Sequence, residues 1–265
     1  MSDIVKKPDP PPTGGLMLNK GKLRSSASPF QQRVNQAKSN VEDATTMPNR
    51  LCLMLDKSSS MSALEDKAGM KQRIDLLKDA VENFASRCDF TNTSVAIETF
   101  PPNVELQLTT MQSAITTAMF GVQASGNTPM HSCVVASLEK IPMTRGIIVS
   151  DGEATDWREQ ELDDEAAFIG EALDEESIAV AGVPVGILSK YKMMGIPIDC
   201  VHIGDSQGGE ELLRRIAKET GGIYLKFTDV GAFAIAFAYL TPGYRAMLTQ
   251  GKVSAKELGA KEINK

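Results

Sequence analysis

The chain has 265 residues, 42% of them apolar, and a formal net charge of −6. This size allows one large domain, or one domain with extensions. The acidic balance excludes a broad electrostatic footprint for nucleic acid, and no stretch approaches the roughly 18 apolar residues of a membrane span. Because the first residues lack the apolar core of a signal peptide, we expect a soluble, cytoplasmic protein.

The first 47 residues differ in composition from the rest of the chain. They contain prolines at positions 8 and 10–12, the pair Gly14-Gly15, and more basic than acidic side chains. Such a segment buries little apolar surface, so we expect residues 1–47 to form an extended arm. The arm is either a disordered tail or a segment that docks on a partner or on the domain that follows.

Cysteine and histidine are scarce and scattered. The sequence contains no CxxC pair. Its cysteines and histidines are Cys52, Cys88, Cys133, Cys200, His131 and His202. This pattern favours buried free thiols over a zinc site or a set of disulfides, and it favours histidines that pack in the core.

A fully buried strand is predicted at Leu51–Leu55, where five consecutive apolar residues end at Asp56. Ligand sites in open α/β sheets lie just past the carboxyl ends of the strands, and here Ser58 and Ser60 follow at alternate positions. A carboxylate with two hydroxyls is a set of hard oxygen ligands that suits Mg²⁺ or Mn²⁺. The alternative is a strand followed by an Asx or Ser turn.

The next elements are predicted from their periodicity. An amphipathic helix spans Ile74–Ala85, and a strand spans Ser94–Phe100. The turn Pro101–Asn103 leads to a short strand at Val104–Leu108, whose brevity and preceding prolines place it at an edge of the sheet.

A loop-to-helix junction follows. After a short helix at Met111–Phe120, the turn Gly126-Asn127 leads to Thr128, and Pro129 then opens a helix at Met130–Leu138. We therefore expect the Thr128 hydroxyl to be able to point into a site.

A second apolar run ends on an acid. Ile147–Val149 is followed by Ser150, Asp151 and Gly152, so the order strand, aspartate, turn occurs twice in the chain. If the two strands are neighbours at the switch point of a doubly wound sheet, Asp56 and Asp151 lie side by side.

The second half of the chain continues the alternation of strands and helices. Residues 157–176 are acidic at helical spacing, which predicts either a solvated helix or a negatively charged docking surface. Further predictions are a strand at Ile196–Ile203, a helix at Glu210–Thr220 capped by Gly221-Gly222, a strand at Ile223–Phe227, a helix at Val230–Leu240, and a polar tail at 241–265 that could be helical from Ser254. The fold class is therefore α/β: a doubly wound, mostly parallel sheet with helices on both faces and one short antiparallel edge strand.

Taken together, three of these loops resemble the von Willebrand factor type A (VWA) domain family, also called integrin I-like. The motifs are a DxSxS loop at Asp56–Ser60, a Gly-x-Thr-Pro segment at Gly126–Pro129, and Ser150-Asp151-Gly152. Thr220–Tyr224 also resembles the segment that leads into the last strand of the family. The resemblance covers residues 48–240, and the long stretch between 156 and 195 indicates an insertion beside the metal face.

This resemblance implies a complete metal-ion-dependent adhesion site (MIDAS) of the intracellular prokaryotic or phage type. Ser58 and Ser60 would bind Mg²⁺ or Mn²⁺ through their hydroxyls, Thr128 would bind directly or through water, and Asp56 and Asp151 would supply negative charge. Because two carboxylates only neutralise a dication, the ion remains able to hold a third carboxylate from a partner protein.

We therefore expect a non-enzymatic, metal-dependent protein-binding module whose partner supplies a Glu or Asp. By the resemblance, that partner is a MoxR-like AAA ATPase or a component of a larger assembly, and neither nucleic acid nor a membrane is expected. The alternative is a structural subunit of a virion or secretion-like machine, docked through residues 1–47 and 241–265, and virion-associated if it is encoded by a phage. A bound metal could activate water, but the sequence shows no general base among the ligands, no phosphate loop and no GxGxxG after a strand.

Overall fold

The computed structural model describes residues 44–64, 71–103, 105–152, 154–157, 186–227, 233, 237–242, 250 and 262–264. The chain separates into two units, residues 1–36 and 37–265, and all of the described residues belong to the second. The end of the segment predicted as an arm packs on this unit, because Ala44 is buried and its carbonyl accepts a 2.6 Å hydrogen bond from Ser94 Oγ.

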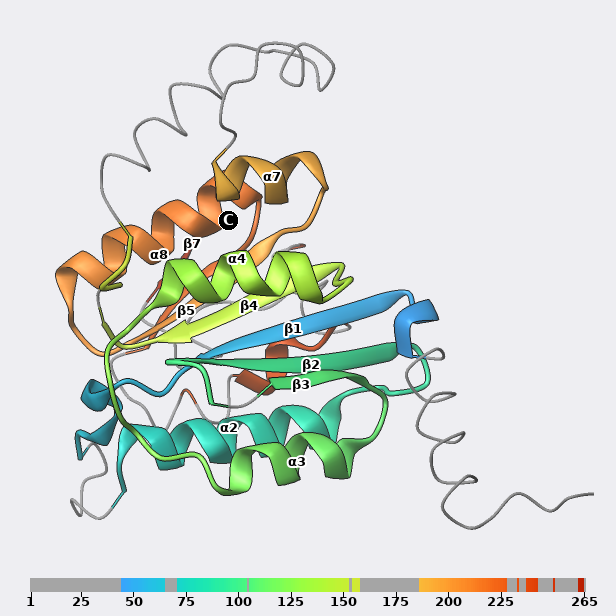
Figure 1. Cartoon of the computed structure of the whole chain (residues 1–265), viewed down its shortest axis with the longest axis horizontal. Helices are drawn as coiled ribbons and strands as arrows, with labels where there is room; N and C mark the ends of the chain where they lie inside the picture. The colour runs from blue at the N-terminus through green and yellow to red at the C-terminus, as the bar shows by residue number, and fades with distance from the viewer. Residues whose placement is uncertain are drawn as a thin grey trace, which may run out of the picture. The chain divides into compact units, whose positions relative to one another are not determined.

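A seven-stranded sheet forms the centre of the domain, in the order β3-β2-β1-β4-β5-β6-β7 (Figure 1). The strands are β1 (Asn49–Asp56), β2 (Thr93–Phe100), β3 (Glu105–Thr109), β4 (Arg145–Ser150), β5 (Ile198–Ile203), β6 (Tyr224–Phe227) and β7 (Glu262–Asn264). The five central strands are parallel, whereas β3 pairs antiparallel with β2 and β7 pairs antiparallel with β6. The predicted doubly wound, mostly parallel sheet is confirmed.

The second antiparallel edge differs from the sequence prediction, which had one such strand and left a helix open for the tail from Ser254. Glu262–Asn264 pairs with β6 instead, with Ile263 opposite Leu225. The backbone N–H and C=O groups of an edge strand have no partners, so a distant segment can add to it as one more strand. Three residues are too few to show a periodicity of their own, and residues 254–261 lie outside the described ranges.

Helices cover both faces of the sheet. They are α2 (Arg73–Arg87), α3 (Gln112–Phe120), α4 (Met130–Lys140), α7 (Ile187–Met193) and α8 (Gln207–Thr220), with 3₁₀ turns η1 (Ser59–Ser62) and η2 (Phe237–Leu240). In Figure 1, α2 and α3 lie on one side of the sheet, and α4, α7 and α8 lie on the other. Of the helix predicted at 230–240, the structure describes Phe233 and η2. Within the described ranges, no helix is long and apolar enough to cross a lipid bilayer.

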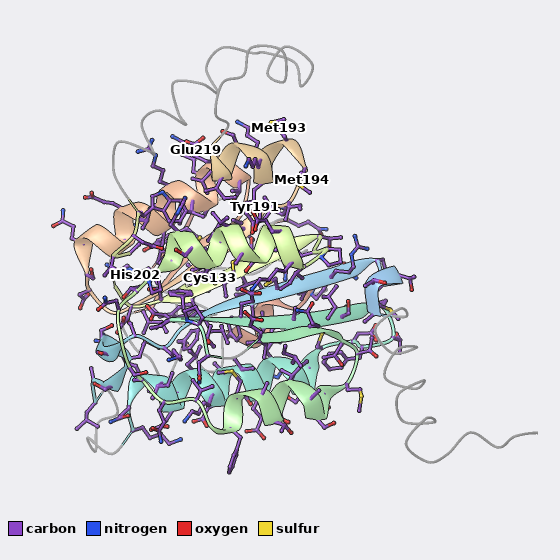
Figure 2. The ribbon with its side chains drawn as sticks, viewed as in Figure 1. Cys133, Tyr191, Met193, Met194, His202 and Glu219 are labelled. Carbon is purple, nitrogen blue, oxygen red and sulfur yellow. The ribbon has the colours of Figure 1, made fainter. Side chains whose placement is uncertain are left out.

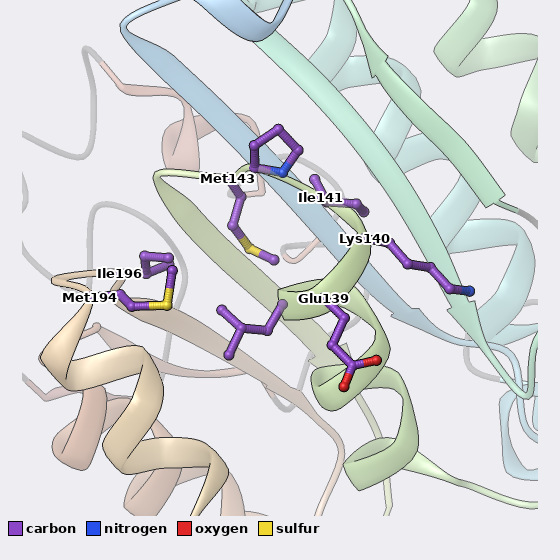
Figure 3. A pocket seen from close by; sticks show the side chains of 8 residues that line it. Glu139, Lys140, Ile141, Met143, Met194 and Ile196 are labelled. Carbon is purple, nitrogen blue, oxygen red and sulfur yellow. The ribbon is translucent and has the colours of Figure 1, made fainter. Parts of the chain in front are cut away.

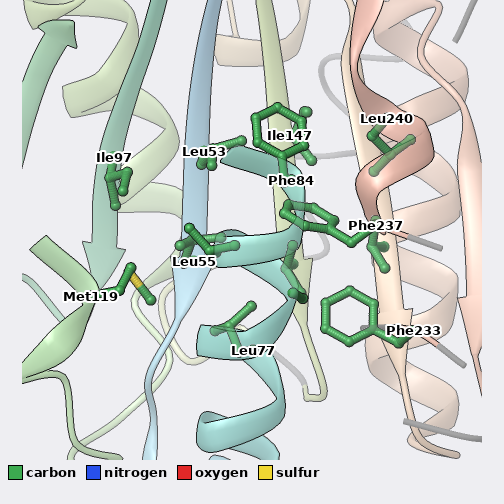
Figure 4. Close-up of a cluster of buried hydrophobic side chains, with 14 of the residues drawn as sticks. Leu53, Leu55, Leu77, Phe84, Ile97, Met119, Ile147, Phe233, Phe237 and Leu240 are labelled. Carbon is green, nitrogen blue, oxygen red and sulfur yellow. The ribbon is translucent and has the colours of Figure 1, made fainter. Parts of the chain in front are cut away.

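The alternation of side chains along β1 supplies two apolar cores. Leu53 and Leu55 face α2 and pack with Leu77, Phe84 and Phe237 (Figure 4). Cys52 and Met54 point to the opposite face and pack under α4, α7 and α8. Because both faces are covered, the strand is buried from Leu51 to Asp56, which explains its unbroken apolar sequence.

The region predicted as an insertion, residues 156–195, is described at its two ends. Helix α7 packs against α4 and α8, and Tyr191 donates a 2.9 Å hydrogen bond from its hydroxyl to the Val134 carbonyl. The acidic segment predicted at 157–176 lies outside the described residues except for Trp157. All four cysteines are free thiols, three of them buried and Cys88 half-buried.

Candidate metal centre

The carboxyl ends of β1 and β4 meet at the switch point of the sheet. These strands are parallel neighbours, with Leu55 opposite Val149, although their ends are separated by more than 90 residues of chain. Asp56 therefore lies beside Ser150 and Asp151, as the two strand-acid-turn motifs predict. Ligand sites of open α/β sheets occur at this position, where strand order reverses.

Asp56 is fully buried and accepts two short hydrogen bonds. Its Oδ1 accepts from the Ser58 backbone N–H at 2.7 Å, and its Oδ2 accepts from the Ser150 hydroxyl at 2.6 Å. Burial raises the pKa of Asp56 to about 6, and the neighbouring Asp151 charge adds to this rise, while the hydrogen bonds from Ser150 and Ser58 oppose it. The site thus concentrates negative charge that a cation would stabilise.

The hydroxyls of the DxSxS loop connect Asp56 to Asp151. The 3₁₀ turn η1 folds Ser60 back toward the strand ends, so Ser58 Oγ and Ser60 Oγ lie 2.9 Å apart. Ser60 Oγ then donates to Asp151 Oδ1 at 2.7 Å. Four of the five predicted residues therefore form one continuous hydrogen-bonded set.

The loop that carries Thr128 is bonded to the DxSxS loop through Ser125 and Gly126. The Ser59 backbone N–H donates to the Gly126 carbonyl at 2.9 Å, and the Ser125 N–H donates to the Lys57 carbonyl at 2.7 Å, so the loop before α4 is bonded to the DxSxS loop. Thr128 itself is 7% exposed, and its carbonyl accepts from the Thr155 N–H at 2.9 Å. Its backbone is thus held between the DxSxS loop and the segment that follows Asp151.

Asp156 fastens that following segment to α4. Its Oδ1 accepts from the His131 N–H at 3.0 Å, and its Oδ2 accepts from the N–H and hydroxyl of Ser132 at 2.8 and 2.7 Å. Because Pro129 at the start of α4 makes no side-chain cap, Asp156 caps the helix from another part of the chain. The sequence reasoning missed this residue, since its partners lie 24 and 25 positions away.

Arg73 is the second residue that sequence reasoning missed. It is the first residue of α2, and its Nη1 lies 2.7 Å from Asp151 Oδ2. The Asp151 side chain is fully buried, and that of Arg73 is 20% exposed. No local motif predicts this pair, because a single arginine at the start of a helix does not indicate which distant residue it contacts.

The chemistry of the donor set suits a hard dication. Two carboxylates and the serine hydroxyls present oxygen atoms, which Mg²⁺ and Mn²⁺ prefer. Among the described residues, no three His, Cys, Asp or Glu side chains form a cluster that could hold a metal ion. The present set has two carboxylates, and its remaining oxygen ligands are hydroxyls. The residues therefore fit the ion that the DxSxS resemblance implies.

The histidines lie outside this set of ligands. His131 packs edge-on against Trp157, with ring centroids 5.1 Å apart. His202 (labelled in Figure 2) is buried on β5, and its Nδ1 lies 3.2 Å from the Tyr224 hydroxyl. Burial, with a smaller contribution from Lys226, lowers the pKa of His202 to about 4. His202 therefore packs in the core as predicted, whereas His131 is half-buried and packs at the edge of the fold against Trp157.

A pocket of about 230 Å³ opens at the other end of the strands (Figure 3). Residues 138–143 line it together with Met194 and Ile196, so it lies near the amino ends of β4 and β5. None of the predicted metal ligands contributes to it.

Comparison with known proteins places the fold. No family model and no curated protein sequence matches the chain. Among solved structures, it is similar to the SpRpn10 VWA domain, with a TM-score of 0.53 and 11% identity over 73% of this chain and 95% of that one. The fold is that of a VWA domain.

Two further structures agree with this VWA fold. The conserved hypothetical protein BatB from Bacteroides thetaiotaomicron matches with a TM-score of 0.50 and 14% identity, over 77% of this chain and 100% of that one. The vWF domain of the type V pili tip protein Mfa5 from Porphyromonas gingivalis matches with a TM-score of 0.50 and 11% identity, over 79% and 97%. At identities this low, the structural similarity shows the fold alone, and function has to be argued from the site.

Proposed function

We propose that the protein is a metal-dependent protein-binding module that uses Mg²⁺ at the switch point to engage an acidic side chain of a partner. One observation carries the proposal: Asp56, Ser58, Ser60 and Asp151 form a continuous hydrogen-bonded set of hard oxygen donors. Ser58, Ser60 and Thr128 would hold the ion through hydroxyls, and Asp56 and Asp151 would balance its charge. When bound, the ion supplies an electrophilic position for an outside carboxylate.

Neighbouring residues orient the two carboxylates of the proposed site. The Ser58 N–H and the Ser150 hydroxyl fix both oxygens of Asp56, and Ser60 orients Asp151. We propose a binding protein and not an enzyme, because a general base is needed to activate water. The oxygen atoms of this set belong to hydroxyls and buried carboxylates that are already engaged in hydrogen bonds. The partner would present a Glu or Asp; a MoxR-like AAA ATPase is one candidate, by the resemblance stated above.

Titration of Mn²⁺ into the full chain by calorimetry tests the metal site. Wild type should bind one ion. Asp56→Asn should bind Mn²⁺ at least about tenfold more weakly, since a neutral amide replaces a carboxylate that balances the charge of the ion. Asp205→Asn is the matched control, because Asp205 follows the neighbouring strand β5 but its side chain is 79% exposed. Equal Mn²⁺ binding by wild type and Asp56→Asn would refute the assignment.

Co-purification then tests the partner. A protein retained in Mg²⁺ and released by EDTA, and absent with Asp56→Asn, supports the proposed function. A stoichiometric partner that survives EDTA but is lost on deletion of residues 1–43 would support the structural-subunit alternative. Phosphatase or nuclease turnover that Asp151→Ala abolishes would instead make the protein an enzyme.

A further inference from the structure

Arg73 places a fixed positive charge against one side of the proposed metal site. Its Nη1 lies 2.7 Å from Asp151 Oδ2, whereas Ser60 holds the other oxygen, Oδ1. The two contacts use different oxygens of the same carboxylate. The guanidinium can therefore stay on Asp151 while the hydroxyl side of the site receives a cation.

The position of Arg73 is set by tertiary structure. A cation in the first turn of a helix is disfavoured by the helix dipole, and Arg73 is the first residue of α2. Its backbone N–H donates to the Ala63 carbonyl at 2.9 Å, just after the DxSxS loop. Its guanidinium also lies over Gly204, where an added Cβ would be 3.3 Å from Nη2. Three segments thus hold the charge beside the site.

The guanidinium of Arg73 changes the net charge of the metal site. Asp56 and Asp151 by themselves would neutralise a dication, so an acidic ligand would be held by coordination to the ion without a net charge on the site to attract it. The guanidinium makes the loaded site one charge more positive than it would be without Arg73, and this favours binding of a carboxylate from outside. Arg73 also repels the dication when no carboxylate is present, and the burial of Asp151 limits the screening of this repulsion by water.

We propose that Arg73 is a specificity-determining residue that weakens binding of the dication alone and couples it to an acidic ligand. The inference rests on the proposed function and deepens it. The residue acts through charge on the bound ion and on the incoming carboxylate. Metal and acidic partner would therefore bind cooperatively, and each would bind weakly without the other.

The test is calorimetric titration of Mn²⁺ into the full chain, with and without acetate as a model carboxylate and with chloride at equal ionic strength as the reference. Arg73→Gln should bind Mn²⁺ alone about tenfold more tightly than wild type. Acetate should tighten Mn²⁺ binding severalfold in wild type and less in the variant. Arg87→Gln is the matched control and should behave as wild type, because it removes the same charge from the exposed far end of α2, about 20 Å away.

The outcomes separate this inference from the proposed function. If wild type binds Mn²⁺ and Arg73→Gln binds it equally or more weakly, the role of Arg73 is wrong and the metal site stands. If neither protein binds Mn²⁺, both proposals fail. If only the variant binds, Arg73 suppresses metal binding even more strongly than proposed. Thermal unfolding in EDTA checks the fold, and Arg73→Met repeats the test should the Gln variant not fold.

Discussion

The Ser150 hydroxyl donates a 2.6 Å hydrogen bond to Asp56 Oδ2 and so joins the carboxyl ends of β4 and β1. Both residues are fully buried. The bond satisfies one oxygen of a carboxylate that is out of contact with water, and its loss would leave that oxygen without a donor at high cost. This residue pair is a structural support of the proposed metal centre, independent of whether an ion is bound.

We therefore expect Ser150→Ala to lower the free energy of unfolding by about 1–3 kcal/mol. Urea unfolding in EDTA at pH 7 measures this difference without any contribution from metal. Ser86→Ala is the control, since Ser86 is exposed and its hydroxyl only returns to the Asn83 carbonyl of its own helix; it should change stability by less than about 0.5 kcal/mol. Equal effects of the two substitutions would contradict the supporting role of Ser150.

Asp156 should matter for both stability and metal affinity. It provides three acceptor contacts at the start of α4, so Asp156→Ala should cost about 1–2 kcal/mol, as removal of a helix cap does. Asp156→Asn retains one acceptor oxygen and should cost less. Because the neighbouring Thr155 binds the Thr128 carbonyl, Mn²⁺ affinity measured by calorimetry should fall with Asp156→Ala as well. A variant as stable as wild type would show that α4 does not need this cap.

Two adjacent glycines should respond differently to substitution. Gly221 caps α8 at φ +75°, with open space around it, so Gly221→Ala should cost about 1–2 kcal/mol from the left-handed backbone alone. A Cβ on Gly222 would lie 1.9 Å from the Ile198 carbonyl oxygen, so Gly222→Ala should prevent β5 and β6 from packing as they do. Thermal unfolding and expression of soluble protein measure both. A folded Gly222→Ala with the stability of Gly221→Ala would show that the backbone there can move.

His202 should make stability depend on pH. Its pKa in the fold is about 4, lowered first by burial and then by Lys226, while Glu210, Asp151 and Asp205 act in the opposite direction. The unfolded chain has a histidine pKa near 6.5, so between these values the unfolded state binds more protons. The stabilisation is therefore complete above about pH 6.5 and is lost as the pH falls toward 4, by up to roughly 3 kcal/mol.

Urea unfolding at pH 7.0, 5.5 and 4.5 tests this pH dependence. In His202→Gln, the side chain cannot become charged, so the loss of stability on acidification should be smaller than in wild type by about the amount attributed to His202. Parallel pH profiles for the two proteins would show that another group causes the acid sensitivity.

Much of the fold could be predicted from the sequence because its central strands are buried on both faces. Such strands leave unbroken apolar runs, and the two that lead to Asp56 and Asp151 indicated both the parallel sheet and the place of the site. Helices α2, α3, α4 and α8 were predicted to within a few residues, since their apolar positions recur at helical spacing, whereas α7 was not predicted. Strand β7 was missed because it forms by pairing with the open edge of β6, and its own three residues are too few to show a strand pattern.

The sequence by itself determined the order of strands β1 to β6 and of helices α2, α3, α4 and α8, and the kinds of oxygen ligand at the ends of two strands. These features depend on local periodicity and on residue chemistry at a strand end, which neighbouring positions in the chain carry. Only the tertiary structure decided that Arg73 meets Asp151, that Ser150 holds Asp56, and that Asp156 caps α4. Each of these contacts joins segments 24 to 94 positions apart, so its free energy is gained only once folding has brought the segments together.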